Sequence, residues 1–209
     1  MVLRVSDTIL EGRDLALWRG ERFLFQGLGF SLGASEALLL SGPNGSGKTS
    51  LLRLIAGLIR PTSGVVLWHG TSISDHEFFR HDLHYVGHLD AVKPLLTVAE
   101  NIDFWSNLRG GRATVTALDH FGLREISDLP ARFLSAGQRR RVGLARLLAA
   151  PGKLWLLDEP AVGLDTQSVA ALLAAIREHR ADGGVVVAAS HGDLVLENAR
   201  ILTLQETPS

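Results

Sequence analysis

The stretch that decides the fold is Gly42-Pro-Asn-Gly-Ser-Gly-Lys-Thr49, which matches the pattern G-x-x-x-x-G-K-[ST]. A short apolar run at 37–40 precedes it, and a segment with helical apolar spacing at 48–58 follows it. This order of strand, glycine-rich loop and helix is the context in which the pattern binds phosphate. Glycines let backbone N–H groups curl around phosphate oxygens, and the helix N-terminus adds positive potential. The sequence therefore predicts a phosphate-binding loop.

Eight residues form this predicted loop and are candidates for contact with ATP. They are Gly42, Pro43, Asn44, Gly45, Ser46, Gly47, Lys48 and Thr49. We expect Lys48 to neutralise the β- and γ-phosphates of ATP and Thr49 to place its hydroxyl on Mg²⁺. Kinases, GTPases and many ATPases share such a loop, so residues further along the chain must distinguish these classes.

Two further apolar runs, at 154–157 and 185–189, flank a segment at 166–180 with helical apolar spacing. Strands that are apolar throughout and separated by helices indicate a parallel sheet covered on both faces. Residues 8–66 contain more alternating strands, which are typical of an antiparallel edge, whereas residues 73–150 lack strong strand signals. We therefore expect an α/β fold with a helical insertion.

The domain organisation follows from the same pattern. The sequence has no internal repeat, low-complexity tract or long Pro/Gly/Ser linker that would separate flexible domains. We expect a single domain over 1–209, with a core at about 1–72 and 151–209 and a helical subdomain at about 73–150.

Two adjacent carboxylates, Asp158 and Glu159, directly follow the apolar run at 154–157. In this arrangement the first carboxylate holds Mg²⁺ and the second polarises the attacking water. We expect Asp158 to join Thr49 as a metal ligand and Glu159 to be catalytic. An apolar run followed by Asp-Glu is frequent by chance, so this pair gains its weight from the other motifs.

Leu134-Ser-Ala-Gly-Gln138 starts another predicted helix, and Ala189-Ser190-His191 follows the run at 185–189. With the phosphate loop and the Asp-Glu pair, these segments occur in the order and approximate spacing of the ABC ATPases. The chain resembles that family over essentially its whole length. The resemblance implies a P-loop NTPase fold of the ABC nucleotide-binding type, with a mostly parallel core sheet, an antiparallel β edge and a helical subdomain.

The resemblance also implies roles for residues outside the phosphate loop. The signature candidates are Ser135, Ala136, Gly137 and Gln138. They would grip the γ-phosphate of ATP bound by a second copy of the chain, since a helix N-terminus favours anions. Asp165 would lie in the loop that communicates between the two sites, and His191 would be catalytic by contacting the γ-phosphate and orienting water.

Two positions depart from the family pattern. Most members place a Gln about ten residues before the segment Leu96-Thr97-Val98, whereas this chain has His88. A ring nitrogen of His88 could bind water or metal, or the residue could be structural. Many members stack adenine on an aromatic residue near the start. Here Trp18 and Arg19 are the alternatives, and Trp18 is also a candidate for the core.

Several segments resemble the ATP-binding export subunits of cytochrome c biogenesis, a subfamily that often carries Gly-His where other members have Gln. These segments are Arg19-Gly-Glu-Arg22, Leu24-Phe25, Tyr85-Val-Gly-His88, Lys93, Glu100-Asn-Ile-Asp-Phe-Trp105 and residues 134–142. The resemblance implies a peripheral subunit on the cytoplasmic face of a bacterial inner membrane. There it would power integral membrane partners in haem export or haem-chaperone release, with no direct haem ligation by this chain.

Two other functions are the alternatives: an ATPase subunit of another small-substrate exporter, or a soluble ABC protein acting on nucleic acid or ribosomes. The formal net charge of −1 gives no general attraction to nucleic acid, and we expect no nucleic-acid partner. Cysteine is absent from the sequence, which excludes disulfides and thiolate metal sites. No apolar run is long enough to cross a bilayer, and Asp7 and Glu11 interrupt any signal-like segment at the start.

A basic cluster follows the signature segment. Its members are Arg139, Arg140, Arg141 and Arg146. The alternatives are a solvated helix face and a functional role, in which the arginines support the helix or meet acidic surfaces of a partner.

Overall fold

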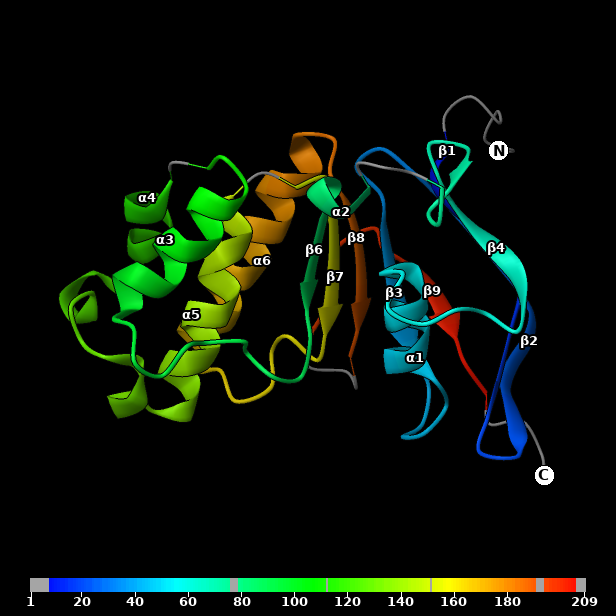
Figure 1. Cartoon of the computed structure of the whole chain (residues 1–209), viewed down its shortest axis with the longest axis horizontal. Coiled ribbons are helices and arrows are strands. Elements are labelled where there is room, and N and C mark those ends of the chain that lie inside the picture. The colour runs from blue at the N-terminus through cyan, green and yellow to red at the C-terminus, as the bar shows by residue number, and fades with distance from the viewer. Residues whose placement is uncertain (1–7, 76–78, 112, 151, 191–193, 206–209) are drawn as a thin grey trace.

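Two β-sheets and a group of helices lie side by side in the computed structural model, which describes residues 8–75, 79–111, 113–150, 152–190 and 194–205 (Figure 1). A five-stranded sheet occupies the middle, with a four-stranded sheet on one side and most of the helices on the other. This arrangement confirms the α/β fold expected from the sequence.

The central sheet is parallel, with the strand order β6-β7-β8-β3-β9. Its strands are β3 (Ala37–Ser41), β6 (Leu83–Val86), β7 (Leu154–Asp158), β8 (Val185–Ala189) and β9 (Arg200–Thr203). The three apolar runs predicted as buried strands are β3, β7 and β8. In the register of the sheet, Ala188 pairs with Leu39 on one side and with Leu157 on the other.

Both faces of the central sheet are buried, which explains why its inner strands are apolar throughout. On β7, Leu154 and Leu156 belong to one hydrophobic core, whereas Trp155 and Leu157 belong to a second. Successive side chains of a strand point to opposite faces, so one strand contributes to both cores.

The four-stranded sheet is antiparallel and has the order β2-β1-β4-β5. Its strands are β1 (Thr8–Arg19), β2 (Arg22–Gly33), β4 (Ser63–Trp68) and β5 (Thr71–Ser72). Its buried side chains, including Leu10, Phe25 and Trp68, pack into the core that also holds Leu154 and Leu156. The expected antiparallel edge is confirmed.

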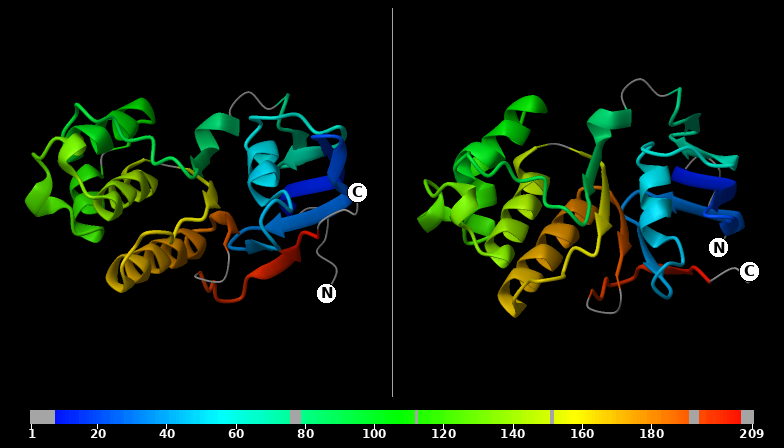
Figure 2. Two further views of the ribbon diagram at one scale, coloured as in Figure 1. Left: turned by 90° about the horizontal axis from the view of Figure 1, so that it is seen from below. Right: turned by 60° about the horizontal axis from the view of Figure 1, so that its bottom comes forward.

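The helices divide between the two cores. They are α1 (Lys48–Ile55), α2 (Phe79–Asp82), α3 (Val98–Leu108), α4 (Thr114–His120), α5 (Ala136–Ala149) and α6 (Thr166–Ala181). Helix α1 packs between the two sheets, whereas α3, α4 and α5 gather at the end of the molecule away from the antiparallel sheet (Figure 2). Within the described ranges, no helix combines the length and the apolar character needed to cross a membrane.

One expectation for residues 73–150 is wrong, because this range is not purely helical. Strand β6 lies inside it and pairs in parallel with β7, at the edge of the central sheet. The strand has only four residues, two of which are His84 and Tyr85, so it is too short and too polar to show an apolar strand pattern.

Candidate nucleotide site

The predicted phosphate loop connects β3 to α1 and turns through three glycines with positive φ, Gly42, Gly45 and Gly47. Gly42 has φ 134°, and a Cβ there would lie 2.2 Å from the carbonyl oxygen of Leu204. No side chain fits that space. The loop therefore needs glycine to pass this close to the chain that follows β9.

The loop offers donors that suit phosphate oxygens. Helix α1 starts after Gly47 without a side-chain cap, so its first backbone N–H groups have no side-chain partner from that cap position. The hydroxyl Oγ of Ser46 is buried and has no hydrogen-bond partner within the described residues. A helix N-terminus with an additional buried hydroxyl fits the binding of a nucleotide phosphate.

Lys48 is the first residue of α1 and is only 6% exposed. Its Nζ donates hydrogen bonds to the carbonyl oxygens of Gly42, at 2.7 Å, and of Pro43, at 3.0 Å. The ammonium group is thus held across the loop, where it lies close to any phosphate that the loop binds.

The two predicted metal ligands lie together. Thr49 Oγ1 donates a hydrogen bond to Oδ1 of Asp158 over 3.0 Å, although 109 positions separate them in the sequence. Asp158 is buried at the end of β7, and Thr49 lies in the first turn of α1. Burial raises the pKa of the nearby Tyr85 phenol, an effect that Arg53 opposes and Asp158 reinforces.

Glu159 borders the same hollow as the phosphate loop. This hollow has a volume of about 280 Å³ and is lined by Leu24, Asn44, Gly45, Gly47, Lys48, Thr49, Ser50 and Glu159. The backbone of Glu159 has φ 48°, and its N–H donates to the carbonyl of Ala189 over 3.0 Å. Positive φ is uncommon for a residue with a side chain and is often found at functional sites.

The signature segment begins α5 but is not among the residues that line this hollow, as far as the chain is described. Ser135 is the N-cap of α5, and its Oγ accepts from Gln138 N over 3.2 Å. In return, Gln138 Oε1 accepts from Ser135 N over 2.9 Å. This capping box closes the helix end on itself.

Asp165 caps the next helix. It is the N-cap residue of α6, and its Oδ1 accepts from Ser168 N over 2.7 Å. This hydrogen bond lowers the pKa of the Asp165 carboxyl. A Cβ at Gly137 would lie 3.2 Å from the carbonyl oxygen of Gly163, so the loop that leads to Asp165 approaches the signature segment.

The structure does not place the remaining predicted residues among the described residues that line this hollow. His88 is exposed just after β6, and Arg19 is exposed at the end of β1. Trp18 is 52% exposed and packs edge-to-face on Phe23, so it is not a core residue. His191 lies outside the described residues.

Most of the basic cluster is not a solvated helix face, although Arg139 is exposed. Arg140 and Arg146 are each only 6% exposed, and Arg141 donates to the carbonyls of Phe121 and Gly122. Arg146 Nη2 donates to the Tyr85 carbonyl over 2.6 Å, and burial lowers its pKa to about 10. A run of charged residues predicts an exposed surface. In this structure, however, backbone carbonyl groups accept hydrogen bonds from Arg140, Arg141 and Arg146.

The sequence patterns did not predict that two residues, Leu24 and Arg22, lie beside the phosphate loop. Leu24 lines the hollow, and Arg22 Nη2 lies 4.0 Å from where a Cβ of Gly45 would stand. Both belong to β2, about twenty positions before the loop, so no local pattern connects them to it. They are also part of the segments that carry the subfamily resemblance.

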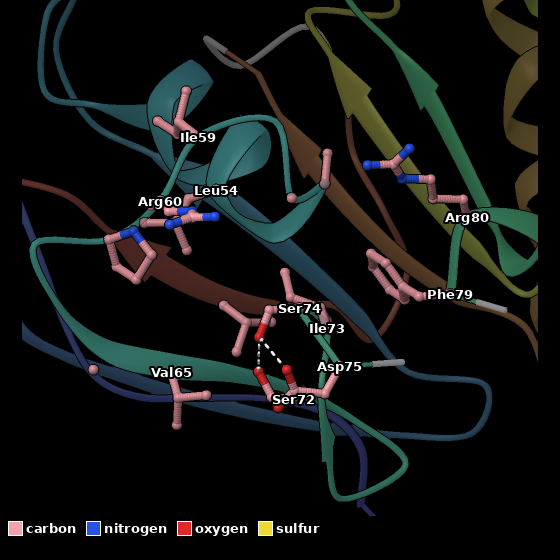
Figure 3. Close-up of a pocket in the computed structure, with 15 residues that line it drawn as sticks. Leu54, Ile59, Arg60, Val65, Ser72, Ile73, Ser74, Asp75, Phe79 and Arg80 are labelled. Atoms are coloured by element: carbon pink, nitrogen blue, oxygen red, sulfur yellow. Dashed lines mark hydrogen bonds between the residues drawn. The ribbon is translucent and has the colours of Figure 1, made fainter. Parts of the chain in front are cut away.

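A second, larger hollow lies apart from the phosphate loop (Figure 3). It has a volume of about 900 Å³ and is lined from the end of α1, from β4 and β5 and from α2, with Ile59, Ile73 and Phe79 among its apolar residues. Arg60, Asp75 and Arg80 add charge to its lining. None of the predicted nucleotide residues is among the described residues that line it.

Comparison with known proteins places this site in a family. The profile of the ABC transporter family matches residues 25–162, more than half of the chain. The cytochrome c biogenesis ATP-binding export protein CcmA of Paramagnetospirillum magneticum is 50% identical, over 97% of this chain and 96% of the relative. The protein of that name from Rhodospirillum rubrum is 51% identical, over 95% of this chain and 87% of the relative.

Solved structures agree on the fold. The ATP-binding subunit of an ABC transporter gives a TM-score of 0.85 at 24% identity, covering 96% of this chain and 89% of that chain. A dimeric ATP-binding cassette in a post-hydrolysis state, bound to ADP and phosphate, gives 0.83 at 24% identity, covering 96% and 97%. The chain therefore belongs to the ATP-binding subunits of ABC transporters, which are ATPases, and within them to the cytochrome c biogenesis ATP-binding export proteins CcmA.

Proposed function

We propose that two copies of this chain enclose two ATP molecules and hydrolyse them to drive integral membrane subunits in cytochrome c maturation. One observation carries the ATPase mechanism: the phosphate loop, the pair Thr49 and Asp158, and Glu159 all meet at one edge of the central sheet. These groups supply phosphate binding, a place for a cation and a carboxylate beside it.

Binding depends on the loop and the residues that follow it. Backbone N–H groups and Lys48 hold the phosphates of ATP. Thr49 and Asp158 would hold Mg²⁺, because hydroxyl and carboxylate oxygens are ligands that this ion prefers, and their 3.0 Å separation places both at one point. When bound there, Mg²⁺ neutralises the negative charge of the β- and γ-phosphates.

Hydrolysis depends on Glu159. Its place in the lining of the hollow allows its carboxylate to accept a proton from the water that attacks the γ-phosphate. We assign to His191 the task of orienting the γ-phosphate and that water.

The second copy completes each site. On this proposal, the start of α5 from one copy meets the γ-phosphate of ATP held by the phosphate loop of the other. Asp165, near the signature segment through Gly163, would connect the two sites. The dimeric cassette of the same fold, bound to ADP and phosphate, supports this arrangement.

Glu159→Gln tests the hydrolytic assignment. The amide cannot accept the proton, so kcat should fall by about 10³-fold while ATP binding is retained. ATP should also convert the variant to a dimer that persists, measurable by size-exclusion chromatography. A normal steady-state rate in Glu159→Gln would contradict the catalytic role.

The membrane function is inferred from the relatives, which are named as export proteins of cytochrome c biogenesis. We place the chain as a peripheral subunit on the cytoplasmic face of the bacterial inner membrane, where it powers haem export or haem-chaperone release. A tagged chain should co-purify with integral membrane subunits, and its deletion should abolish mature c-type cytochromes. Normal cytochrome maturation in the deletion strain would contradict this assignment.

A further inference from the structure

Arg140 is a buried arginine that the proposed mechanism does not use. It is the fifth residue of α5, and its guanidinium contacts the end of β7 and the segment that follows β6. Within the described part of the chain, it donates five hydrogen bonds, to the carbonyl oxygens of Gly87 (3.0 Å), Asp158 (3.1 Å), Glu159 (2.7 Å) and Pro160 (3.3 Å) and to Oδ1 of Asp90 (2.8 Å). The planar fork of arginine permits this many partners at once.

Three of these partners are successive carbonyl groups of the backbone that carries the proposed catalytic carboxylate. Glu159 has φ 48°, a conformation that costs free energy for a residue with a side chain and persists only where its surroundings hold it. Its N–H is held by the carbonyl of Ala189 at 3.0 Å, and its own carbonyl is held by Arg140 at 2.7 Å. The turn is therefore fixed from both sides.

The other two partners belong to the segment after β6, which contains His88. Arg140 binds the Gly87 carbonyl on one side of His88 and the Asp90 carboxylate on the other. A Cβ at Gly143 would lie 3.1 Å from Cβ and O of Asp90, so glycine at that position lets this segment pass close to α5. Asp90 supplies the negative charge that a buried guanidinium requires.

We propose that Arg140 is a positioning residue, which fixes the Glu159 turn relative to α5 and to the segment around His88. One side chain thereby links the helix that starts with Ser135 to the hydrolytic carboxylate of the same chain. The inference rests on the proposed catalytic role of Glu159. Arg140 is not part of the phosphate-loop lining, so it acts on hydrolysis and not on the binding of ATP.

The test compares substitutions of two buried arginines on one helix. Arg140→Gln should lower kcat by about 10- to 100-fold with little change in KM for ATP, because a displacement of about 1 Å at a catalytic group costs up to that factor. Arg146→Gln is the matched control, since Arg146 is equally buried but donates to Tyr85 and not to the Glu159 turn. It should lower the melting temperature and leave kcat within about twofold below that temperature.

Two further variants separate positioning from folding. Arg140→Lys keeps the charge beside Asp90 but loses the fork, so its kcat should lie between those of the wild type and Arg140→Gln. It decides the outcome if Arg140→Gln does not fold. Asp90→Asn should lower kcat less than Arg140→Gln, and the double variant should be no slower than Arg140→Gln alone, because both act through one side chain.

The outcomes distinguish this inference from the proposed mechanism. If Glu159→Gln is nearly inactive but both Arg140 variants keep kcat within about twofold, or lose it only in parallel with Arg146→Gln, the positioning role is wrong. If Glu159→Gln itself keeps a normal kcat, the proposed mechanism fails first. A selective loss of kcat in the Arg140 variants, with Arg146→Gln active, supports the proposal.

Discussion

Helices α1 and α5 both start at a segment that we propose to bind a phosphate of ATP, but their first turns are built differently. Helix α1 follows Gly47 in a left-handed conformation and has no side-chain cap. Helix α5 starts with reciprocal hydrogen bonds between Ser135 and Gln138. A capping box satisfies two backbone N–H groups within the chain, whereas an uncapped end leaves them for a ligand. The end of α1 therefore has free donors for a ligand. On our proposal, that ligand is the ATP held by the same copy, whereas the capped end of α5 meets ATP held by the other copy.

Of the substitutions that separate the two helix ends, Lys48→Ala should have the largest effect, a loss of ATP binding at the start of α1. The ammonium group is held across the loop by the carbonyls of Gly42 and Pro43. On our proposal it also forms charge-assisted hydrogen bonds with phosphate, each contributing about 1.5–3 kcal/mol. We expect ATP affinity to fall by about 10- to 100-fold, measured by calorimetry on the isolated chain. Unchanged affinity would place the nucleotide elsewhere.

Ser135→Ala should impair the function of the α5 end, which we propose is needed for turnover, without affecting ATP binding at the start of α1. On our proposal the Ser135 hydroxyl contacts the γ-phosphate of ATP held by the other copy, so its loss should lower turnover by about tenfold. Loss of the helix cap should lower stability by about 1 kcal/mol. ATP affinity of the monomer should be unchanged. Ser135→Thr, which keeps a capping hydroxyl, is the matched control for stability. If Ser135→Ala weakens ATP binding to the monomer, the two ends are not separate as proposed.

The smallest expected effect is on the stability of the fold and involves His179 of α6. The ring of His179 stacks on Trp155 of β7 at 4.0 Å, and burial lowers the pKa of this histidine from 6.5 to about 4. Between these values the unfolded chain binds a proton that the folded chain does not, so stability falls as the pH falls. From pH 6.5 to 5.5 the free energy of unfolding should drop by about 1 kcal/mol. Urea titrations of the wild type and His179→Phe measure this, and an equal drop in both would contradict the assignment.

Much of the fold follows from patterns that depend on a few neighbouring residues. Strands β3, β7 and β8 are apolar throughout because both faces of their sheet are buried. The loop at 42–49 and the two carboxylates at the end of β7 are contiguous motifs, so their positions follow once the strands are known. The parallel pairing of β3, β7 and β8 then brings Thr49 and Asp158 together at one edge.

The features that sequence could not predict depend on distant partners. Strand β6 has four residues, and its pairing with β7 is what makes it a strand. The arginine run after Gln138 has the appearance of a charged surface, yet the partners of Arg140 come from positions 18 to 53 residues away. A single sequence does not reveal such partners, because every residue has the same backbone carbonyl whatever its side chain.

The dual packing of β7 has a consequence for how the molecule comes apart. Alternate side chains of this one strand belong to the two separate cores, and the strand ends at the acidic pair. Neither core can melt and leave the other with an intact strand, so a single cooperative transition is expected. Bound nucleotide, which touches only the end of that strand on our proposal, would then protect the whole chain against unfolding.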